Sequence, residues 1–510
     1  MDTDLTNVIL FGVENEYSIH VFDEQGGQTS AAAVEHIVRS SLAERLGNHA
    51  LPFLESRGGY AVENGGRIYW DRIGSISAAE CSTPEVRSPL EACQYVLAGH
   101  RFYRELADDL QAARRASAVE VCLSGVCLQT GHANGIHLNY YRSVDEPIER
   151  LVPHLASLPS ICGAGGWALR PYACLQFVRS QRAELIAQVS GSDSSHGRPL
   201  VDSYHKPYCR RGRRVQDLSA DATHSMSPLY VRLGSTALLL AMVDLWDLRL
   251  GHLSPADPVA AMKIWNCDPN QKLQVAGGAR YSALDVQRCL LELVRRQIDR
   301  PRGRVPQWSD DLAAMWDKLI HAAADEDCDD RVSLGWAMHE SLLKYLCVQH
   351  DFDWLKLPTI AQVYVRLKAL RGSLSPESDV SNLGHGRVGE PELEEIKAVL
   401  QAAAIKWDEF ERATRWLQPI LHLASTELLE VGRGASTCFE AEMRRRLPAL
   451  TEELIAAARS IPPQDTRAKV RGAFVSKFAG TAGGAGWDAL SHPDGRRIEL
   501  PDPFDFDVEV

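Results

Sequence analysis

The sequence has no apolar run long enough to cross a membrane. A span needs roughly 18 apolar residues, whereas the longest candidate, Thr236 to Val243, is about half that length and is followed by Asp244. The 12 cysteines include no Cys-x-x-Cys pair and no Cys/His cluster with the spacing of zinc ligands. We therefore expect no membrane association, no structural zinc, and reduced, mostly buried thiols in a cytoplasmic protein.

Positive charge is also scarce. The 510 residues include 55 Lys and Arg against 67 Asp and Glu, which gives a net charge of -12. Because contact with a nucleic-acid backbone needs basic surface, this balance excludes a general nucleic-acid-binding protein but permits one local nucleotide site. With 45% apolar residues the chain can bury a large core, and its length predicts about two to four domains.

The glycine-rich motifs that bind phosphate are missing as well. The sequence contains no Gly-x-x-x-x-Gly-Lys-Ser/Thr loop and no dinucleotide-binding glycine fingerprint. If the protein uses ATP, metal ions and side chains on a sheet must therefore hold the phosphates.

Three segments, Asn7 to Phe22, Gly66 to Asp71 and Gly135 to Tyr140, are predicted strands with one polar face each. Side chains alternate along a strand, so every second residue points the same way. The polar faces consist of Glu14 and Glu16; of Arg67, Tyr69 and Asp71; and of His137 and Asn139.

Further carboxylates, Glu80 and Glu85, follow the second strand. Four or five carboxylates on one sheet repel one another unless cations neutralise them. Oxygen ligands suit Mg²⁺, which usually arrives with nucleotide phosphates. The alternative is a polar face that is simply solvated, as in many antiparallel sheets.

A basic segment, Tyr208 to Arg214, contains four arginines. A solvated basic loop is one interpretation. A phosphate clamp is the other, because arginine binds phosphate oxygens through a fork of donors.

The rest of the chain is expected to be mostly helical, over residues 235–370 and 390–480. A helix is also predicted from Ser88 to about Ala113, since Ser88 is a capping residue, Pro89 suits the first helical position and Glu91 follows three residues after the cap. The segment from Leu374 to Pro391 is rich in Ser, Gly and Pro and is predicted to be a linker or loop.

At its polar strands the sequence resembles the Pup ligase and Pup deamidase/depupylase family, relatives of glutamine synthetase and the carboxylate–amine ligases. The motifs that carry the resemblance occur in the family's order along most of the chain outside about 371–430. They include GVENEY from Gly12, NGGRIYWD from Asn64, AECSTPE from Ala79, GIHLNYY from Gly135, DTRAKVRG from Asp465 and GWDAL from Gly486.

The resemblance implies an α+β fold, in which a curved, mainly antiparallel β-sheet cradle packs on helices as in glutamine synthetase. We expect a catalytic domain at 1–445 with a helical insertion around 371–430, and a small C-terminal domain, rich in helix, at 446–510.

The resemblance also implies roles for individual residues. Asp71 is the expected catalytic carboxylate. The expected metal ligands or phosphate-site groups are Glu14, Glu16, Tyr69, Glu80, Glu85 and His137. The expected ATP contacts are Arg67, Thr83, Arg211, Arg213, Arg214 and Trp487.

The activity implied is ATP- and Mg²⁺-dependent. A phosphoryl group passes from ATP to a carboxylate on a small Pup-like protein modifier, and a lysine amine of a target protein then displaces the phosphate to form an isopeptide bond. The hydrolytic branch of the family carries a long loop between the first strand and the Asn-Gly-Ala-Arg segment. Here only 47 residues separate Glu16 from Asn64 and they include a helix-like stretch from Ala31 to Leu46, so the long loop is expected to be absent, which favours a ligase. A deamidase or isopeptidase and a non-catalytic nucleotide- or peptide-binding module are the alternatives.

Overall fold

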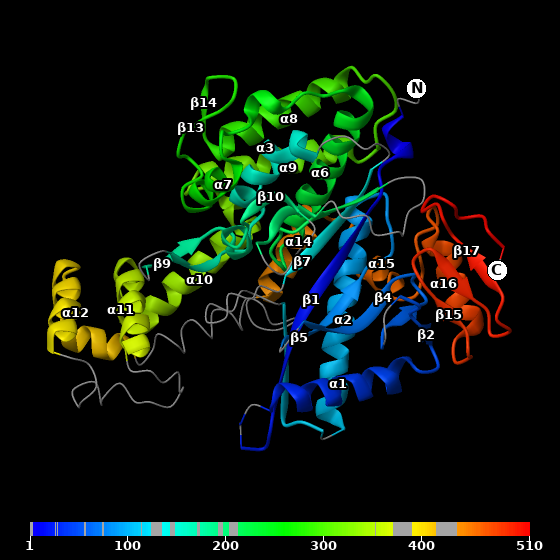
Figure 1. The fold of residues 1–510 in the computed structure, drawn as a ribbon, viewed down its shortest axis with the longest axis horizontal. Helices are drawn as coiled ribbons and strands as arrows, with labels where there is room; N and C mark the ends of the chain where they lie inside the picture. The colour runs from blue at the N-terminus through cyan, green and yellow to red at the C-terminus, as the bar shows by residue number, and fades with distance from the viewer. Residues whose placement is uncertain are drawn as a thin grey trace.

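The computed structural model describes residues 4–509 apart from 26, 28, 56–57, 74–75, 114, 124–134, 143–147, 171–173, 192–196, 203–212, 352, 371–389 and 415–435. Helices pack on a large, mainly antiparallel sheet (Figure 1), which confirms the α+β fold expected from the sequence.

The central sheet has ten strands within the described residues, in the order β10-β11-β12-β7-β1-β5-β4-β3-β2, with β6 paired to the second half of β1. Of these pairs, β10 with β11 is parallel. The strands are β1 (Phe11–Phe22), β2 (Ala50–Pro52), β3 (Tyr60–Val62), β4 (Arg67–Ile73), β5 (Ile76–Ser82), β6 (Ala118–Leu123), β7 (Ile136–Arg142), β10 (Gln188–Gly191), β11 (Pro199–Asp202) and β12 (Arg213–Asp217).

The register of the sheet places the predicted polar residues on one face. Glu14 lies opposite Ser82 on β5 and opposite His137 on β7. Glu80 lies opposite both Glu16 and Tyr69. Directly opposed residues point to the same side of a sheet, so β1, β4, β5 and β7 present their carboxylates, Tyr, Arg and His together. The three predicted strands are confirmed, except that the first begins at Phe11 and not at Asn7, where a short 3-10 helix (Leu5–Asn7) ends.

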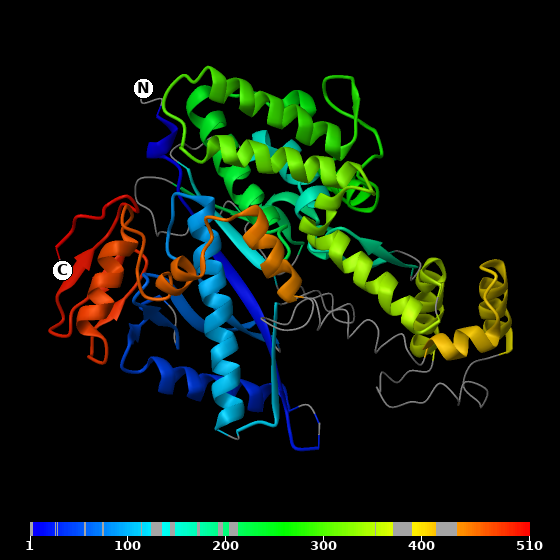
Figure 2. The same ribbon diagram turned by 180° about the vertical axis from the view of Figure 1, so that it is seen from behind.

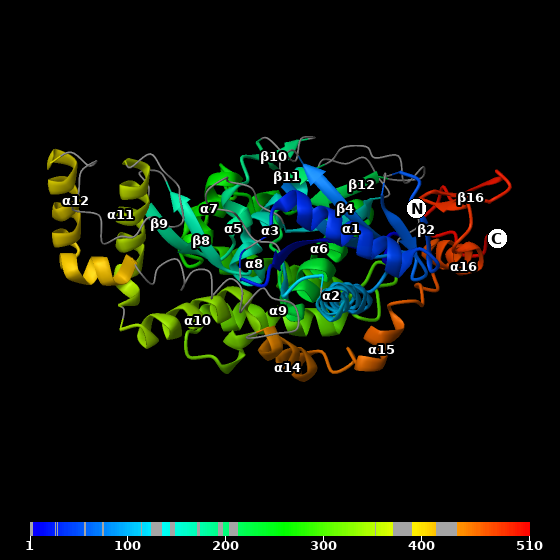
Figure 3. The same ribbon diagram turned by 90° about the horizontal axis from the view of Figure 1, so that it is seen from below.

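Helices cover the other face. Seen from behind, α2 (Pro89–Ala112) runs along the sheet (Figure 2). Seen from below, α2 lies on the same side of the molecule as α9 (Ser309–Ala324), α10 (Gly335–Gln349) and α14 (Ser436–Arg446), and β10, β11 and β12 lie on the opposite side (Figure 3). The predicted start of α2 at Ser88 is confirmed, but the Ser88 side chain makes no capping hydrogen bond, so the expected side-chain cap was wrong.

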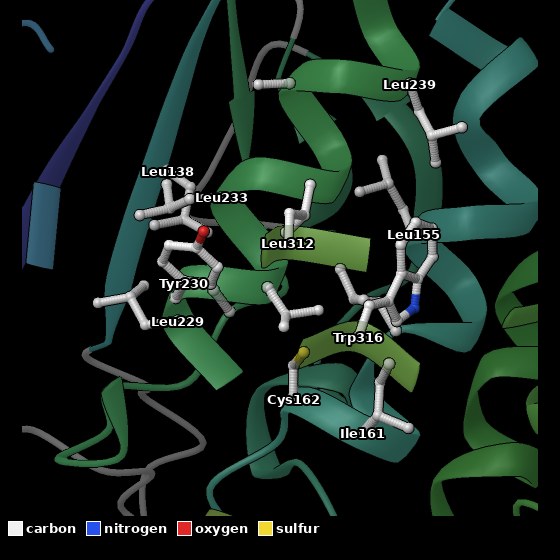
Figure 4. Close-up of a cluster of buried hydrophobic side chains, with 14 of the residues drawn as sticks. Leu138, Leu155, Ile161, Cys162, Leu229, Tyr230, Leu233, Leu239, Leu312 and Trp316 are labelled. Carbon is white, nitrogen blue, oxygen red and sulfur yellow. The ribbon is translucent and has the colours of Figure 1, made fainter. Parts of the chain in front are cut away.

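The main core surrounds α6 (Met226–Trp246). By length and composition this helix could cross a membrane, but its apolar stretch is entirely buried within the protein. Its residues Tyr230 and Leu233 belong to one buried cluster with Leu138 of β7, with Leu312 and Trp316 of α9 (Ser309–Ala324) and with Leu155 of α3 (Val152–Ser157) (Figure 4). The helix therefore serves as the central core helix.

The remaining helices of the main body are α1 (Ala31–Leu46), α3 (Val152–Ser157), α4 (Pro159–Cys162), α5 (Gln181–Glu184), α7 (Pro258–Cys267), α8 (Ala283–Asp299) and α9 (Ser309–Ala324). Two short hairpins are formed by β8 (Gly166–Arg170) with β9 (Cys174–Val178) and by β13 (Leu273–Gln274) with β14 (Arg280–Tyr281). The prediction of a helix from Ala31 to Leu46 is confirmed at both ends.

A helical arm projects from this body at the left of Figure 1. Its elements are α10 (Gly335–Gln349), α11 (Leu357–Leu370) and α12 (Glu390–Ala402), followed in the chain by α14 (Ser436–Arg446). Most of the predicted linker from Leu374 to Pro391 lies outside the described residues. Within the expected insertion, α12 packs against α11 through Ile396, Leu400 and Ile360.

The C-terminal unit lies beside β2 and β3 (Figure 1). It contains α16 (Ala468–Phe478) and a sheet of β15 (Gly484–Ala485), β16 (Ala489–Ser491) and β17 (Arg497–Glu499). The preceding helix, α15 (Glu452–Ala457), packs on α2 instead, and its Ile455 belongs to the main core. This small sheet was not predicted. Phe474 and Leu490 share a core with Leu51 and Phe53 of the β2 region, so the unit is attached directly to the edge of the main sheet. The domain boundary at residue 445 stays a prediction.

Candidate functional site

The polar face of the sheet forms the floor of a pocket of about 480 Å³. Every predicted site residue that the structure describes lines this pocket. They are Glu14, Glu16, Arg67, Tyr69, Asp71, Glu80, Thr83, Glu85, His137, Arg213, Arg214 and Trp487. Arg211 lies outside the described residues. Strands β1, β4, β5, β7 and β12 and the C-terminal unit therefore bring together groups that are far apart in the sequence.

Glu14 is at the centre of this floor. Its carboxylate accepts hydrogen bonds from the Tyr69 hydroxyl and from the Ser82 hydroxyl, the latter at 3.2 Å, and lies 3.1 Å from His137 Nδ1. Burial acts to raise the pKa of Glu14, but the hydrogen bond and charge of His137, together with Arg67 and Tyr69, hold that pKa well below its usual range. Glu14 is thus an anionic group in a fixed orientation.

Glu80 has the opposite electrostatic environment. It is 3% exposed, and burial, together with the charges of Glu14, Glu16 and Asp71, raises its pKa well above the usual value. Burial and the charges of Glu14 and Glu80 likewise raise the pKa of Tyr69, so its hydroxyl keeps its proton and donates to Glu14. The acidic half of the pocket therefore contains more carboxylates than its own cations offset.

Glu16 and Thr83 both support the backbone of the site. Glu16 Oε2 accepts from the Gly135 N–H at 2.5 Å, which ties β1 to the start of β7. The Thr83 hydroxyl accepts from the Val13 N–H at 3.0 Å and donates to the Pro84 carbonyl at 3.0 Å. The metal and ATP roles expected of these two residues stay predictions.

Glu85 faces the C-terminal unit. Its carboxylate pairs with Arg467 Nε at 2.8 Å and with the Arg471 guanidinium. Although burial favours the neutral acid, Arg471 and Arg467 lower the pKa of Glu85 to about 2. The charge of Glu85 is therefore offset by two arginines of the chain, and the residue holds the C-terminal unit against the main sheet. Its role at the metal or phosphate site stays a prediction.

The rim of the pocket is aromatic and basic. The Arg67 guanidinium lies 3.2 Å from the centre of the Tyr69 ring and 4.9 Å from that of Phe53. Phe53 in turn meets Trp487 edge to face, with 5.4 Å between ring centres. Of these groups Arg67 and Trp487 line the pocket, so they can contact a flat aromatic ligand, whereas Phe53 is buried behind them.

The basic strand β12 forms the wall beyond β7. Arg214 pairs in register with Tyr141 and Gln216 with Asn139, so both point to the face that forms the floor. Arg213 pairs with Arg142 instead, so it alternates away from Arg214 although it still borders the pocket. The structure therefore favours Arg214 over Arg213 as a group that reaches a ligand.

The donor set suits Mg²⁺ only in combination with phosphate. Among the described residues, no group of three or more His, Cys, Asp or Glu side chains is arranged to hold a metal ion by itself. Mg²⁺ usually takes one or two carboxylates and completes its octahedron with waters and substrate phosphates. The crowded carboxylates around Glu80 fit such an ion, because a divalent cation would offset their repulsion.

Sequence analysis missed several lining residues, namely Asp202, Gln216, Tyr141 and Arg467. The alternation in β12 that exposes Arg214 could have identified Gln216. Arg467 and Arg471 are four residues apart in DTRAKVRG, which places both on one side of α16, but nothing local indicates that they would meet Glu85.

Comparisons with known proteins agree with this architecture. The sequence profile of the family described as "Pup-ligase protein" matches residues 9–376. The chain is 28% identical over 312 residues to a depupylase of Acidothermus cellulolyticus, covering 58% of this chain and 59% of that protein. It is 27% identical over 382 residues to a Pup–protein ligase of Kocuria rhizophila, covering 69% of this chain and 77% of that protein. The match thus spans less than two thirds of the depupylase.

Two solved structures share the fold. The complex between the prokaryotic ubiquitin-like protein Pup and its ligase PafA matches with a TM-score of 0.71 at 19% identity, covering 99% of this chain and 90% of that one. PafA in complex with ADP matches with a TM-score of 0.63 at 20% identity, covering 94% and 93%. By its sequence match and its fold, the chain belongs to the Pup-ligase protein family, an enzyme family whose members include Pup ligases and depupylases.

Proposed function

We propose that this chain is an ATP- and Mg²⁺-dependent ligase that joins the C-terminal carboxylate of a small Pup-like modifier to a lysine amine of target proteins through an acyl phosphate. The observation that carries the proposal is that Glu14, Glu80 and Asp71 line one pocket together with Arg67 and Arg214, on the same face of the sheet. Two structures of the same fold support this proposal: the ADP complex of PafA supports the binding of a nucleotide, and the Pup complex of PafA supports the binding of a Pup-like modifier.

Glu14, Glu80 and the Tyr69 oxygen would hold Mg²⁺, with Glu16 and His137 beside them. The bound ion would offset the negative charge on the phosphoryl oxygens. Glu14 is held by Tyr69, Ser82 and His137 before any ligand arrives, so its carboxylate is oriented in advance.

Arg67 and Arg214, with Arg213 and Arg211 as further candidates, would bind the phosphates. Arginine suits this task because its planar fork donates two hydrogen bonds to phosphate oxygens. Trp487 and the aliphatic part of Arg67 would pack against the nucleotide base, with buried Phe53 behind them. Thr83 would contact ATP from the end of β5.

Asp71 is the proposed base. It lines the same pocket from β4, two residues beyond Tyr69, and points to the same side as Arg67 and Tyr69. A lysine ammonium cannot attack a carbonyl until it loses a proton, and a carboxylate at this position would accept that proton.

The interval between β1 and β4 supports ligation over hydrolysis. In this chain α1, β2 and β3 account for half of the residues of this interval, whereas the hydrolytic branch that the sequence resembles carries a long loop there. Isopeptide hydrolysis is the second candidate, and the match to a depupylase is the observation that favours it.

The test uses the full-length chain with a Pup-like modifier, a lysine-bearing acceptor protein, ATP and Mg²⁺. A ligase releases ADP and phosphate in step with conjugates, whereas a hydrolase cleaves a preformed isopeptide without stoichiometric ATP consumption. Asp71→Asn should abolish conjugation and leave ATP binding, measured by calorimetry, within about threefold of wild type. The control Asp317→Asn, at an exposed ion pair on α9, should conjugate normally. Conjugation by Asp71→Asn at wild-type rate would refute the role of Asp71.

A further inference from the structure

Arg471 on α16 is completely buried and joins three separate segments of the chain. Its Nε donates to the Gly65 carbonyl at 2.6 Å, its Nη1 to the Trp487 carbonyl at 3.1 Å, and its Nη2 to the Glu85 carboxylate. Its guanidinium also lies 4.7 Å from the centre of the Trp487 ring. Trp487 and Glu85 line the pocket, and Gly65 precedes the strand that carries Arg67. Arg471 therefore lies directly behind the wall of the site.

Trp487 is also held from its other side, by the segment after β2. Its backbone N–H donates to the Glu55 carboxylate at 2.9 Å, and the Phe53 ring meets its indole edge to face. The carbonyl and the N–H of Trp487 are thus both fixed, one by a cation of the C-terminal unit and one by an anion of the main sheet region. This arrangement determines where the indole ring lies relative to Phe53 and Arg67.

Lysine could not reproduce these contacts. The planar guanidinium of Arg471 donates in three directions at once and stacks on an aromatic ring, whereas an ammonium is a compact point charge. Replacement by lysine need not leave Glu85 unpaired, because Arg467 still pairs with it at 2.8 Å and itself donates to the Leu500 carbonyl at 2.8 Å. The positive charge is also kept, so an Arg471→Lys protein retains the charge balance of the buried cluster.

We propose that Arg471 is a positioning residue that fixes the Trp487 ring at the rim of the pocket and so sets the affinity for a nucleotide base. It acts through Trp487 and contacts no part of the nucleotide. This inference rests on the proposed nucleotide site and adds to it a residue to which sequence analysis gave no role.

The experiment is a double-mutant cycle in the full-length chain, with ADP and Mg²⁺ as the probe and calorimetry as the measurement. Arg471→Lys and Trp487→Ala should each weaken ADP binding at least tenfold. The double variant should bind no more weakly than the weaker single variant, because removal of the indole leaves Arg471 nothing to position. The matched control Arg496→Lys, at an exposed arginine of the same unit, should bind as wild type does.

Amide hydrogen exchange of residues 484–491 without nucleotide gives an independent measurement. Arg471→Lys should speed exchange there at least tenfold, and Arg496→Lys should not. The inference is overturned if Arg471→Lys binds ADP with an affinity within twofold of wild type. It is also overturned if the fold-losses of ADP affinity in the two single variants multiply in the double variant. If the wild-type chain binds no ADP, the proposed function is wrong. The hydrogen-exchange result alone then decides whether Arg471 holds Trp487 in place.

A variant at the opposite side of Trp487 covers the case in which Arg471→Lys does not fold. Glu55 is exposed, so Glu55→Ala removes the acceptor of the Trp487 N–H without opening the core. It should weaken ADP binding severalfold, and this effect should vanish in the Trp487→Ala background. An effect of Glu55→Ala that persists there would overturn the inference.

Discussion

Replacement of Glu85 by glutamine should loosen the C-terminal unit from the main sheet. Glu85 is the only acid that Arg467 and Arg471 both reach among the described ion pairs, and the two arginines lower its pKa from 4.5 to about 2. By linkage, that difference corresponds to about 3 kcal/mol of stability at neutral pH. Loss of one partner of a buried ion pair costs a similar amount, about 3–5 kcal/mol. We therefore expect Glu85→Gln to cost about 3 kcal/mol.

Amide hydrogen exchange across α16 measures this loss locally, and about 3 kcal/mol corresponds to roughly hundredfold faster exchange. The control Glu499→Gln breaks an exposed pair with Arg497 and should change exchange by less than about threefold. The folded-state pKa of Glu85 is depressed, so its contribution is present above pH 4.5 and is lost as the pH falls towards 2. The difference between wild type and Glu85→Gln should shrink over that range. A threefold or smaller effect at pH 7 would refute the docking role of Glu85.

Three other changes test the fold and the pocket. His154 is fully buried, and burial, aided by the charge of Arg232, lowers its pKa to about 3. Between pH 6.5 and that value only the unfolded chain takes up the proton, so a drop from pH 7 to 5 should lower the free energy of unfolding of the wild type by about 2 kcal/mol more than that of His154→Gln, as measured by urea titration. Gly65 and Gly278 both have φ of +80°, but a Cβ on Gly65 would lie 2.6 Å from the Ala468 carbonyl oxygen, whereas a Cβ on Gly278 would meet open space. In thermal unfolding, Gly278→Ala should therefore lower the stability by about 1 kcal/mol and Gly65→Ala by at least twice that amount. Gly486→Ala should displace the Glu55 carboxylate, which a Cβ would approach to 2.2 Å, and so weaken ADP binding severalfold, as measured by calorimetry.

Local pattern was enough to predict three of the strands that build the pocket, β1, β4 and β7, but not β5 or β12, the second of which begins within the segment interpreted as a basic loop. The alternation of Glu14 with Glu16 and of Arg67 with Tyr69 depends only on strand geometry, and the structure has both pairs on the pocket side. The helix from Ala31 to Leu46 was equally local, since its apolar residues recur at helical spacing and the chain places no proline within it.

Long-range pairing could not be predicted in the same way. Glu85 meets Arg471 across 386 residues, and no periodicity encodes such a contact. The missing cap at Ser88 is a local detail: its position at the helix start was predictable, but whether its hydroxyl bonds the first turn depends on the side-chain rotamer. The small sheet of β15 to β17 was not predicted because its strands have only two or three residues each. Such short segments show no recognisable alternation of apolar and polar residues.

Three acids among the described residues have arginine partners that Glu80 lacks, and this difference supports the proposed function. Asp217 pairs with Arg232, Asp244 with Arg142, and Glu85 with two arginines, so each of these charges is offset within the chain. Glu80 instead has other acids as its main charged neighbours, and they raise its pKa. A protein that only needed a stable fold would do better with an apolar residue at this position, since a buried and uncompensated carboxylate is costly. The crowding is accounted for if the compensating charge comes with the ligand, as a divalent cation carried by nucleotide phosphates.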